Sequence, residues 1–207
     1  MTAAWAELRI GDYLTALGAS SPTPGGGSAA ALAGALSSAL GRMVVSVALE
    51  KEPTPEREAL AAAFQELEDR FLDLAAEDER AFSDVMDALH LPRDVDGRFE
   101  RLQTALQRAA DVPLRAAGCS VSVLRHLEQA ESHASRAIVS DVGVAAHLTL
   151  AALRSSLLNV AVNAGSLKDA AVSDRLERDA AALRDAAEKV YANIVRRVDA
   201  RLAPRRP

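Results

Sequence analysis

Residues 20–49 read SSPTPGGGSAAALAGALSSALGRMVVSVAL, and the rest of the chain is organised around this stretch. A turn of two prolines and three consecutive glycines leads into an Ala-rich run whose only charged residue is Arg42. This pattern predicts an apolar helix from Ser28 to Leu49, with Ser28 as its N-cap. The backbone N–H groups of a Gly-rich turn at a helix start favour an anion such as a carboxylate. An ordinary helix-start turn is the other interpretation.

The composition argues against several classes of protein. A net charge of −5 over 207 residues disfavours a nucleic-acid partner, and the turn fits neither common nucleotide-binding motif. The single cysteine, Cys119, cannot form an internal disulfide and fits a cytoplasmic protein. Residues 28–49 are long enough for a membrane span, but their small residues and Arg42 favour a buried helix and no membrane partner. The four histidines lack fitting Asp or Glu neighbours, so we expect no metal site.

The remaining segments also have helical periodicity. Apolar residues at helical spacing predict a short helix ending at Gly18 and longer helices over residues 55–89, 99–127, 140–164 and 173–202. Pro113 should kink or restart the second long helix, with Asp111 as a possible cap. Ser140 or Asp141 is a natural cap for the third, which is nearly uncharged.

These helices predict an all-α fold, and residues 1–207 form a single domain. Hydrophobic residues make up 49% of the chain but aromatic residues only 3%, so the core must consist of Ala, Leu and Val. We expect an elongated helical bundle with the two apolar helices, 28–49 and 140–164, at its centre. Their small residues are more than one thin bundle needs to bury, which predicts a homodimer; these residues are Ala29, Ala33, Ala35, Ser37, Ala145, Ala152 and Ser156.

One carboxylate falls on the apolar stripe of a predicted helix. Asp78 and Phe82 are one turn apart and share a face with Leu74 and Val85. Burial raises the pKa of a carboxylate towards neutrality, which makes Asp78 a candidate acid or base. A solvated charge is the other interpretation, because acidic neighbours flank it.

Three polar residues face one way on the second apolar helix. Ser155, Asn159 and Asn163 are spaced by four residues. Buried amides need hydrogen-bond partners, which another helix, a second subunit or a ligand can supply.

Together these motifs resemble the formiminotransferase–cyclodeaminase C-terminal domain family. Their order and spacing agree with the family from about Tyr13 to Asp169. The matching motifs are Pro22-Thr-Pro-Gly-Gly-Gly-Ser28, Asp78-x-x-Ala-Phe82, Leu91-Pro92, Val112-Pro-Leu114, Ser140-Asp-Val-Gly-Val-Ala-Ala146, Leu153-Arg-Ser155 and Asn159-Val-x-Val-Asn163.

The resemblance implies an all-helical dimer that binds folate in a cleft near the dimer interface. It also implies one of two reactions. A cyclohydrolase hydrolyses 5,10-methenyltetrahydrofolate to 10-formyltetrahydrofolate, and a cyclodeaminase cyclises 5-formiminotetrahydrofolate with release of ammonia. Neither reaction needs a metal or redox cofactor, since the tetrahydrofolate derivative is the substrate.

The resemblance also suggests roles for residues. Asp78 and Asp141 would be the catalytic carboxylates, one handling water or a proton and the other holding the pterin or stabilising the cation. The glycine turn would hold part of the folate, and the two asparagines would orient polar edges. The full set of substrate-binding candidates is Pro24, Gly25, Gly26, Gly27, Ser28, Lys51, Phe82, Ser140, Asn159 and Asn163.

Two segments depart from the family pattern. A lysine cluster followed by tyrosine is usual after the first apolar helix, and here only Lys51 stands in that place. An Asn-containing segment is common before Ser140, and here the chain reads Ala134-Ser-Arg-Ala137. These departures leave an alternative open, in which the chain is a catalytically inactive family member serving as a dimeric helical binding or structural protein.

Overall fold

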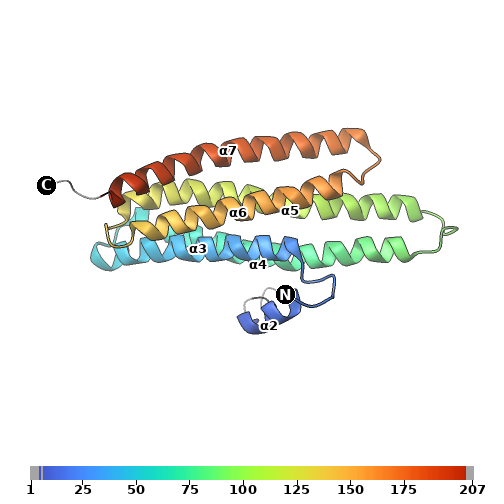
Figure 1. Ribbon diagram of the computed structural model, residues 1–207, viewed down its shortest axis with the longest axis horizontal. Coiled ribbons are helices and arrows are strands. Elements are labelled where there is room, and N and C mark those ends of the chain that lie inside the picture. Colours follow the sequence, from blue (N-terminus) through green and yellow to red (C-terminus); the bar gives the residue numbers. More distant parts are fainter. Residues whose placement is uncertain (1–4, 6, 204–207) are drawn as a thin grey trace.

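The computed structural model describes residue 5 and residues 7–203, and within these residues it contains helices and no strands. The helices are α2 (Ile10–Leu17), α3 (Gly26–Lys51), α4 (Pro55–His90), α5 (Arg98–His133), α6 (Val139–Ala164) and α7 (Ala170–Leu202). The five long helices lie side by side along one axis, and α2 lies apart from them (Figure 1). The prediction of an all-α, elongated bundle is confirmed.

Close packing of α3 on α4 depends on a glycine. A Cβ atom at Gly34 would lie 2.4 Å from the ring of Phe71, which is fully buried. No real Cβ makes such a contact, so only glycine allows the aromatic ring to lie directly on the α3 backbone. A chain with few aromatic residues therefore places one of its largest side chains between two long helices.

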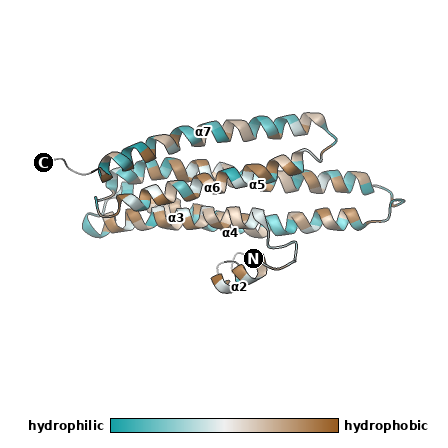
Figure 2. Cartoon of the chain, viewed as in Figure 1, coloured by the Kyte–Doolittle hydropathy of each residue, from teal (hydrophilic) through white to brown (hydrophobic). Residues whose placement is uncertain are grey.

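The prediction that the two apolar helices form the centre is not confirmed. Helix α5 contacts α3, α4, α6 and α7, whereas α3 contacts only α4, α5 and α6 among the described helices. One face of α3 and one face of α6 remain open, and their exposed apolar residues are Leu36, Val144, Leu158 and Val162. Figure 2 shows more hydrophilic colour on α7 than on α3. Composition alone did not reveal that an amphipathic helix occupies the centre.

Most of the small residues proposed for a dimer pack inside the chain. Ala35, Ala145 and Ala152 are buried between neighbouring helices. The Ser37 hydroxyl, also buried, donates to the Ala145 carbonyl oxygen at 2.9 Å and joins α3 to α6. Only Ala29 and Ala33 of this set are partly exposed, so small residues serve mainly the contact between α3 and α6.

Two predicted N-caps are wrong, and one predicted helix restart does not occur. Helix α3 begins at Gly26 with Gly25 at its N-cap, so Ser28 lies inside the first turn and does not cap it. Helix α6 begins after Ile138, and neither Ser140 nor Asp141 makes a capping hydrogen bond. Of the two outcomes expected at Pro113, a kink or a restart, the restart does not occur, because α5 continues through this residue.

The bundle has two chemically different ends. We call the region where α3 starts and α6 stops, which α4 and α5 extend past, the glycine end, and the opposite region, where α3 stops and α6 starts, the arginine end (Figure 1). At the arginine end Arg57 donates to the Ala48 and Glu52 carbonyl oxygens of α3. Arg201 likewise donates to the Glu131 carbonyl oxygen of α5 at 2.6 Å. These guanidinium groups add donors to carbonyls near helix C-termini, where Ala48 and Glu131 also accept the backbone N–H groups of Glu52 and Ala134.

Helices α3 and α6 are each long and apolar enough to cross a membrane by length and composition. Close to half of each apolar stretch is buried inside the bundle. Core helices of a bundle have the same composition.

Candidate active site

A cavity of about 290 Å³ lies at the glycine end. The start of α3, the middle of α4, the middle of α5 and the end of α6 meet there. The residues predicted from the sequence that line it are Gly25, Gly26, Gly27, Asp78, Phe82, Asn159 and Asn163. Residues as far apart in the chain as Pro22 and Asn163 thus line one cavity.

Asp78 lies directly against the glycine turn. A Cβ atom at Gly27 would be 2.2 Å from Asp78 Oδ1, so the missing side chain makes room for the carboxylate. The Ser28 backbone N–H is close enough to that carboxylate to favour its ionised form and lower its pKa. None of the three turn glycines has a positive φ, and only Gly27 is needed for the close approach of Asp78, because a Cβ at Gly26 would meet nothing within 4 Å. The anion expected at this helix start is a carboxylate of the chain itself.

The pKa of Asp78 is raised from 3.8 to about 6. Burial is the main cause, and the negative charge of Glu79 adds to it, while the Ser28 N–H works in the opposite direction. Burial also raises the pKa of Glu79. A carboxyl group with a pKa near neutrality can both accept and release a proton during a reaction.

The N-terminal segment supports the turn from outside the cavity. Ser28 is fully buried, and its hydroxyl donates to the Gly25 carbonyl oxygen at 3.0 Å. The Tyr13 hydroxyl lies 3.5 Å from Ser28 Oγ, and its ring centroid is 5.4 Å from that of Trp5. Tyr13 is the buried residue of α2. No spacing rule in the sequence predicted that α2 would reach Ser28 across the turn.

The NH2 groups of both asparagines donate hydrogen bonds to backbone carbonyl oxygens. Asn159 Nδ2 donates to the Ser155 carbonyl oxygen at 3.0 Å, and Asn163 Nδ2 donates to the Ala109 carbonyl oxygen of α5 at 2.9 Å. Another helix was one of the expected sources of partners, and this holds for Asn163, whereas Asn159 bonds to a carbonyl of its own helix. Both residues still line the cavity.

Other candidates lie elsewhere. Lys51, Ser140 and Asp141 are at the arginine end, so within one chain they do not join Asp78. Asp141 and Asn159 are 18 residues apart on α6, which at 1.5 Å per residue is about 27 Å. Pro24 precedes the turn without lining the cavity.

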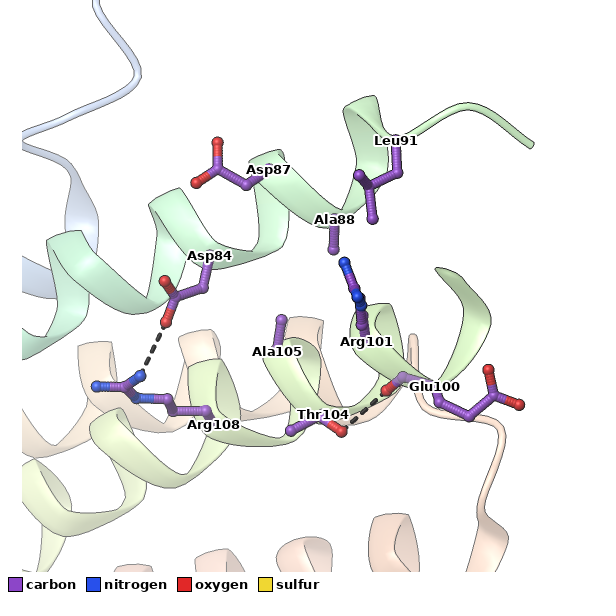
Figure 3. A pocket seen from close by; sticks show the side chains of 9 residues that line it. All are labelled: Asp84, Asp87, Ala88, Leu91, Glu100, Arg101, Thr104, Ala105 and Arg108. Carbon is purple, nitrogen blue, oxygen red and sulfur yellow. Dashed lines mark hydrogen bonds and ion pairs between the residues drawn. The ribbon is translucent and has the colours of Figure 1, made fainter. Parts of the chain in front are cut away.

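Further cavities lack the candidate carboxylates. A larger one of about 500 Å³ lies between α4 and α5, where Arg108 pairs with Asp84 and Arg101 points between Ala88 and Leu91 (Figure 3). One of about 200 Å³ at the arginine end is lined by Lys51 among others. Among the described side chains no group of three or more His, Cys, Asp or Glu is placed to hold a metal ion.

The fold and the cavity define an all-helical protein with a half-buried carboxyl group of raised pKa against a glycine-rich helix start. A sequence profile described as Formiminotransferase-cyclodeaminase matches residues 9–182. Methenyltetrahydrofolate cyclohydrolase of Methylorubrum extorquens is 35% identical over 202 residues, covering 92% of this chain and 97% of that relative. The chain therefore belongs to the formiminotransferase-cyclodeaminase family, and the resemblance found in the sequence is confirmed.

Two further comparisons agree with this membership. Formimidoyltransferase-cyclodeaminase of Gallus gallus is 30% identical over 168 residues, which are 77% of this chain and 31% of the chicken protein. The chain thus matches about a third of that longer protein. The crystal structure of formiminotetrahydrofolate cyclodeaminase from Thermotoga maritima superimposes with a TM-score of 0.87 at 26% identity, covering 94% of this chain and 98% of that one.

Proposed function

We propose that the chain is an enzyme of one-carbon folate metabolism, a methenyltetrahydrofolate cyclohydrolase or a formimidoyltetrahydrofolate cyclodeaminase. The observation that carries this proposal is the position of Asp78. Its carboxyl group lines a cavity beside the N-terminus of α3 and has a pKa of about 6. The names of the relatives support both reactions. We place the cyclohydrolase first, because the relative that matches over 97% of its own length has that name.

In the cyclohydrolase reaction Asp78 acts as the proton carrier. Its carboxylate takes a proton from the water that attacks the methenyl carbon between N5 and N10. The C–N5 bond of the resulting tetrahedral carbon then breaks, and Asp78 returns the proton to N5. The second water proton leaves to solvent as the formyl C=O forms. In the cyclodeaminase reaction the same group moves the N10 proton to the departing ammonia.

We also propose a homodimer in which the partner completes the site. The open apolar faces of α3 and α6 support this, because Leu158 and Val162 are 70% and 72% exposed. A two-fold axis across these helices would lay the arginine end of one copy over the glycine end of the other. Asp141 of the partner subunit would then reach the cavity that holds Asp78.

The first experiment follows the near-UV absorbance of 5,10-methenyltetrahydrofolate against its uncatalysed hydrolysis, with 5-formiminotetrahydrofolate as the second substrate. We expect acceleration, and a loss of at least about 100-fold in both Asp78→Asn and Asp141→Asn. A near-wild-type rate in Asp141→Asn would remove Asp141 from a proton-transfer role.

A mixed dimer tests the sharing of the site. One Asp78→Asn chain and one Asp141→Asn chain, purified through two different tags, leave one intact site per dimer if the partner supplies Asp141. The expected rate is then about half of the wild-type rate, by two-fold symmetry. An inactive mixed dimer would place both carboxylates in the same chain, and a monomeric mass in light scattering would contradict the dimer itself.

The alternative is a dimeric helical binding or structural protein without catalysis. It is favoured by the separation of Asp78 from Asp141 within one chain. No acceleration with either substrate, together with no folate binding by calorimetry, would support it.

A further inference from the structure

Pro113 creates a defect in the backbone of α5. It lies inside the helix and, having no N–H, cannot donate to the carbonyl oxygen four residues earlier, which belongs to Ala109. Ala109 and Pro113 are both buried, and a buried carbonyl without a partner is costly. The chain therefore needs another donor at this position.

Asn163 supplies that donor from α6. Its Nδ2 lies 2.9 Å from the Ala109 carbonyl oxygen. A carbonyl can only accept a hydrogen bond, so the amide must turn its NH2 group towards α5. Its Oδ1 receives no hydrogen bond from any of the residues that the structure describes, and Asn163 lines the cavity. The oxygen is thus the part of this amide that is available to a ligand as an acceptor.

Asn159 repeats the arrangement one turn earlier. Its Nδ2 donates to the Ser155 carbonyl oxygen, and no described residue donates to its Oδ1. Asp78 adds the oxygens of a carboxylate to the same cavity. Three polar side chains on this wall therefore offer acceptor oxygens, which complement a ligand edge that carries N–H donors or positive charge.

We propose that Pro113 is a positioning residue for this site, which fixes the orientation of the Asn163 amide through the Ala109 carbonyl and so makes the wall selective for the N–H edge of its ligand. This inference rests on the proposed function, in which the ligand is a reduced pterin with ring N–H and amino groups. Pro113 itself touches no substrate in this scheme.

A double-mutant cycle without ligand tests the coupling. Pro113→Ala restores an N–H that can pair with the Ala109 carbonyl oxygen. Asn163→Leu removes the side-chain donor, so in the wild-type background it should lower Tm by about 2–4 °C or more. We expect a clearly smaller loss of Tm when Pro113→Ala is also present. Additive effects in the cycle would overturn the coupling.

Ligand binding tests the consequence. In Pro113→Ala the Asn163 amide is no longer held, and we expect the Kd for 5-formyltetrahydrofolate, a stable folate probe, to rise about tenfold. Val112→Ala, which also removes buried carbons but leaves the N–H pattern of α5 unchanged, should keep the Kd within about twofold. An unchanged Kd in Pro113→Ala would overturn the positioning role. A wild-type protein that binds no folate would contradict the proposed function, and the stability cycle would still decide the coupling.

Discussion

The glycine end and the arginine end treat charge in opposite ways. At the glycine end the Asp78 carboxylate lies in a cavity, and no described cation forms a salt bridge with it. At the arginine end Arg57 and Arg201 donate to carbonyl oxygens at the ends of α3 and α5. The charged side chains at the arginine end therefore stabilise the fold. The ionised form of Asp78, in contrast, lowers the free energy of unfolding, because its partly buried carboxylate has no cation beside it. A group kept at such a cost indicates function more clearly than one that is fully paired.

The largest effect that would separate the two ends is on the rate. We expect Asp78→Asn to lower kcat at least about 100-fold, because the amide cannot carry the proton. In the wild type the rate should fall as the pH drops below about 6, the pKa of Asp78, since the carboxylate must be ionised to take a proton. A full pH–rate profile of both proteins checks this. A wild-type rate that stays level from pH 8 to pH 5 would contradict the assignment.

The second effect concerns the contact that gives Asp78 its place. Gly27→Ala puts a Cβ 2.2 Å from Asp78 Oδ1, which forces the carboxylate to move. We expect a loss of about tenfold or more in kcat/KM, because small displacements of a catalytic group are expensive. Gly118→Ala on α5 is the matched control, since its Cβ would meet nothing within 4 Å. Equal rates in the two variants would mean that the Gly27 contact does not position Asp78.

The third effect is on stability. Asp78→Asn, which should lower the rate, should raise the free energy of unfolding. The pKa of Asp78 is about 6 in the folded chain and 3.8 ordinarily, so its contribution to stability falls as the pH rises through this window. Asp78→Asn removes the cost of ionisation and should raise the free energy of unfolding at pH 7 by about 1–2 kcal/mol. At pH 4 the variant and the wild type should be nearly equal. Urea unfolding of both proteins at pH 7 and pH 4 measures the difference in the free energy of unfolding. A variant that is less stable than the wild type at pH 7 would show that ionised Asp78 does not destabilise the fold.

The smallest effect lies at the arginine end. Arg57→Met leaves the Ala48 and Glu52 carbonyl oxygens without this donor, and we expect a loss of about 1 kcal/mol in the free energy of unfolding. The rate per folded molecule should stay within about twofold, because Arg57 does not line the cavity that holds Asp78. Thermal unfolding and the methenyltetrahydrofolate assay together measure both quantities. A large loss of rate with little loss of stability would show that Arg57 contributes to catalysis.

The sequence predicted the helices well because apolar periodicity and proline signals mark them. Thr54 caps α4 beside Pro55, and Gly165 ends α6, as their residue types suggest. It also offered Asp78 as a carboxylate on the apolar side of its helix, where the structure places it half-buried, and it predicted hydrogen-bond partners for the asparagines. The prediction for Asp78 followed from its position among apolar residues on one side of its helix. The prediction for the asparagines followed from the energetic cost of burying an amide without a hydrogen bond.

Long-range placement was beyond the sequence. The helical rise already places Asp141 and Asn163 at opposite ends of the predicted helix 140–164, but it does not reveal that the cavity with Asp78 lies at the Asn163 end. The Ala109 carbonyl oxygen, which Pro113 cannot reach with an N–H, accepts a hydrogen bond from Asn163, 50 residues after Pro113, and no local rule contains this pairing. The missing N–H of Pro113 was nevertheless a usable signal, because it implied an unpaired carbonyl at Ala109 that some other segment had to satisfy.

The contact between Gly34 and Phe71 restricts how this sequence can change over time. A Cβ at position 34 would overlap the aromatic ring, so a single substitution to alanine there meets an immediate packing penalty. A smaller side chain at position 71 relieves the overlap but leaves a void if glycine remains. The two positions can therefore change only together. Among related sequences we expect a residue larger than glycine at position 34 only where position 71 carries a side chain smaller than phenylalanine.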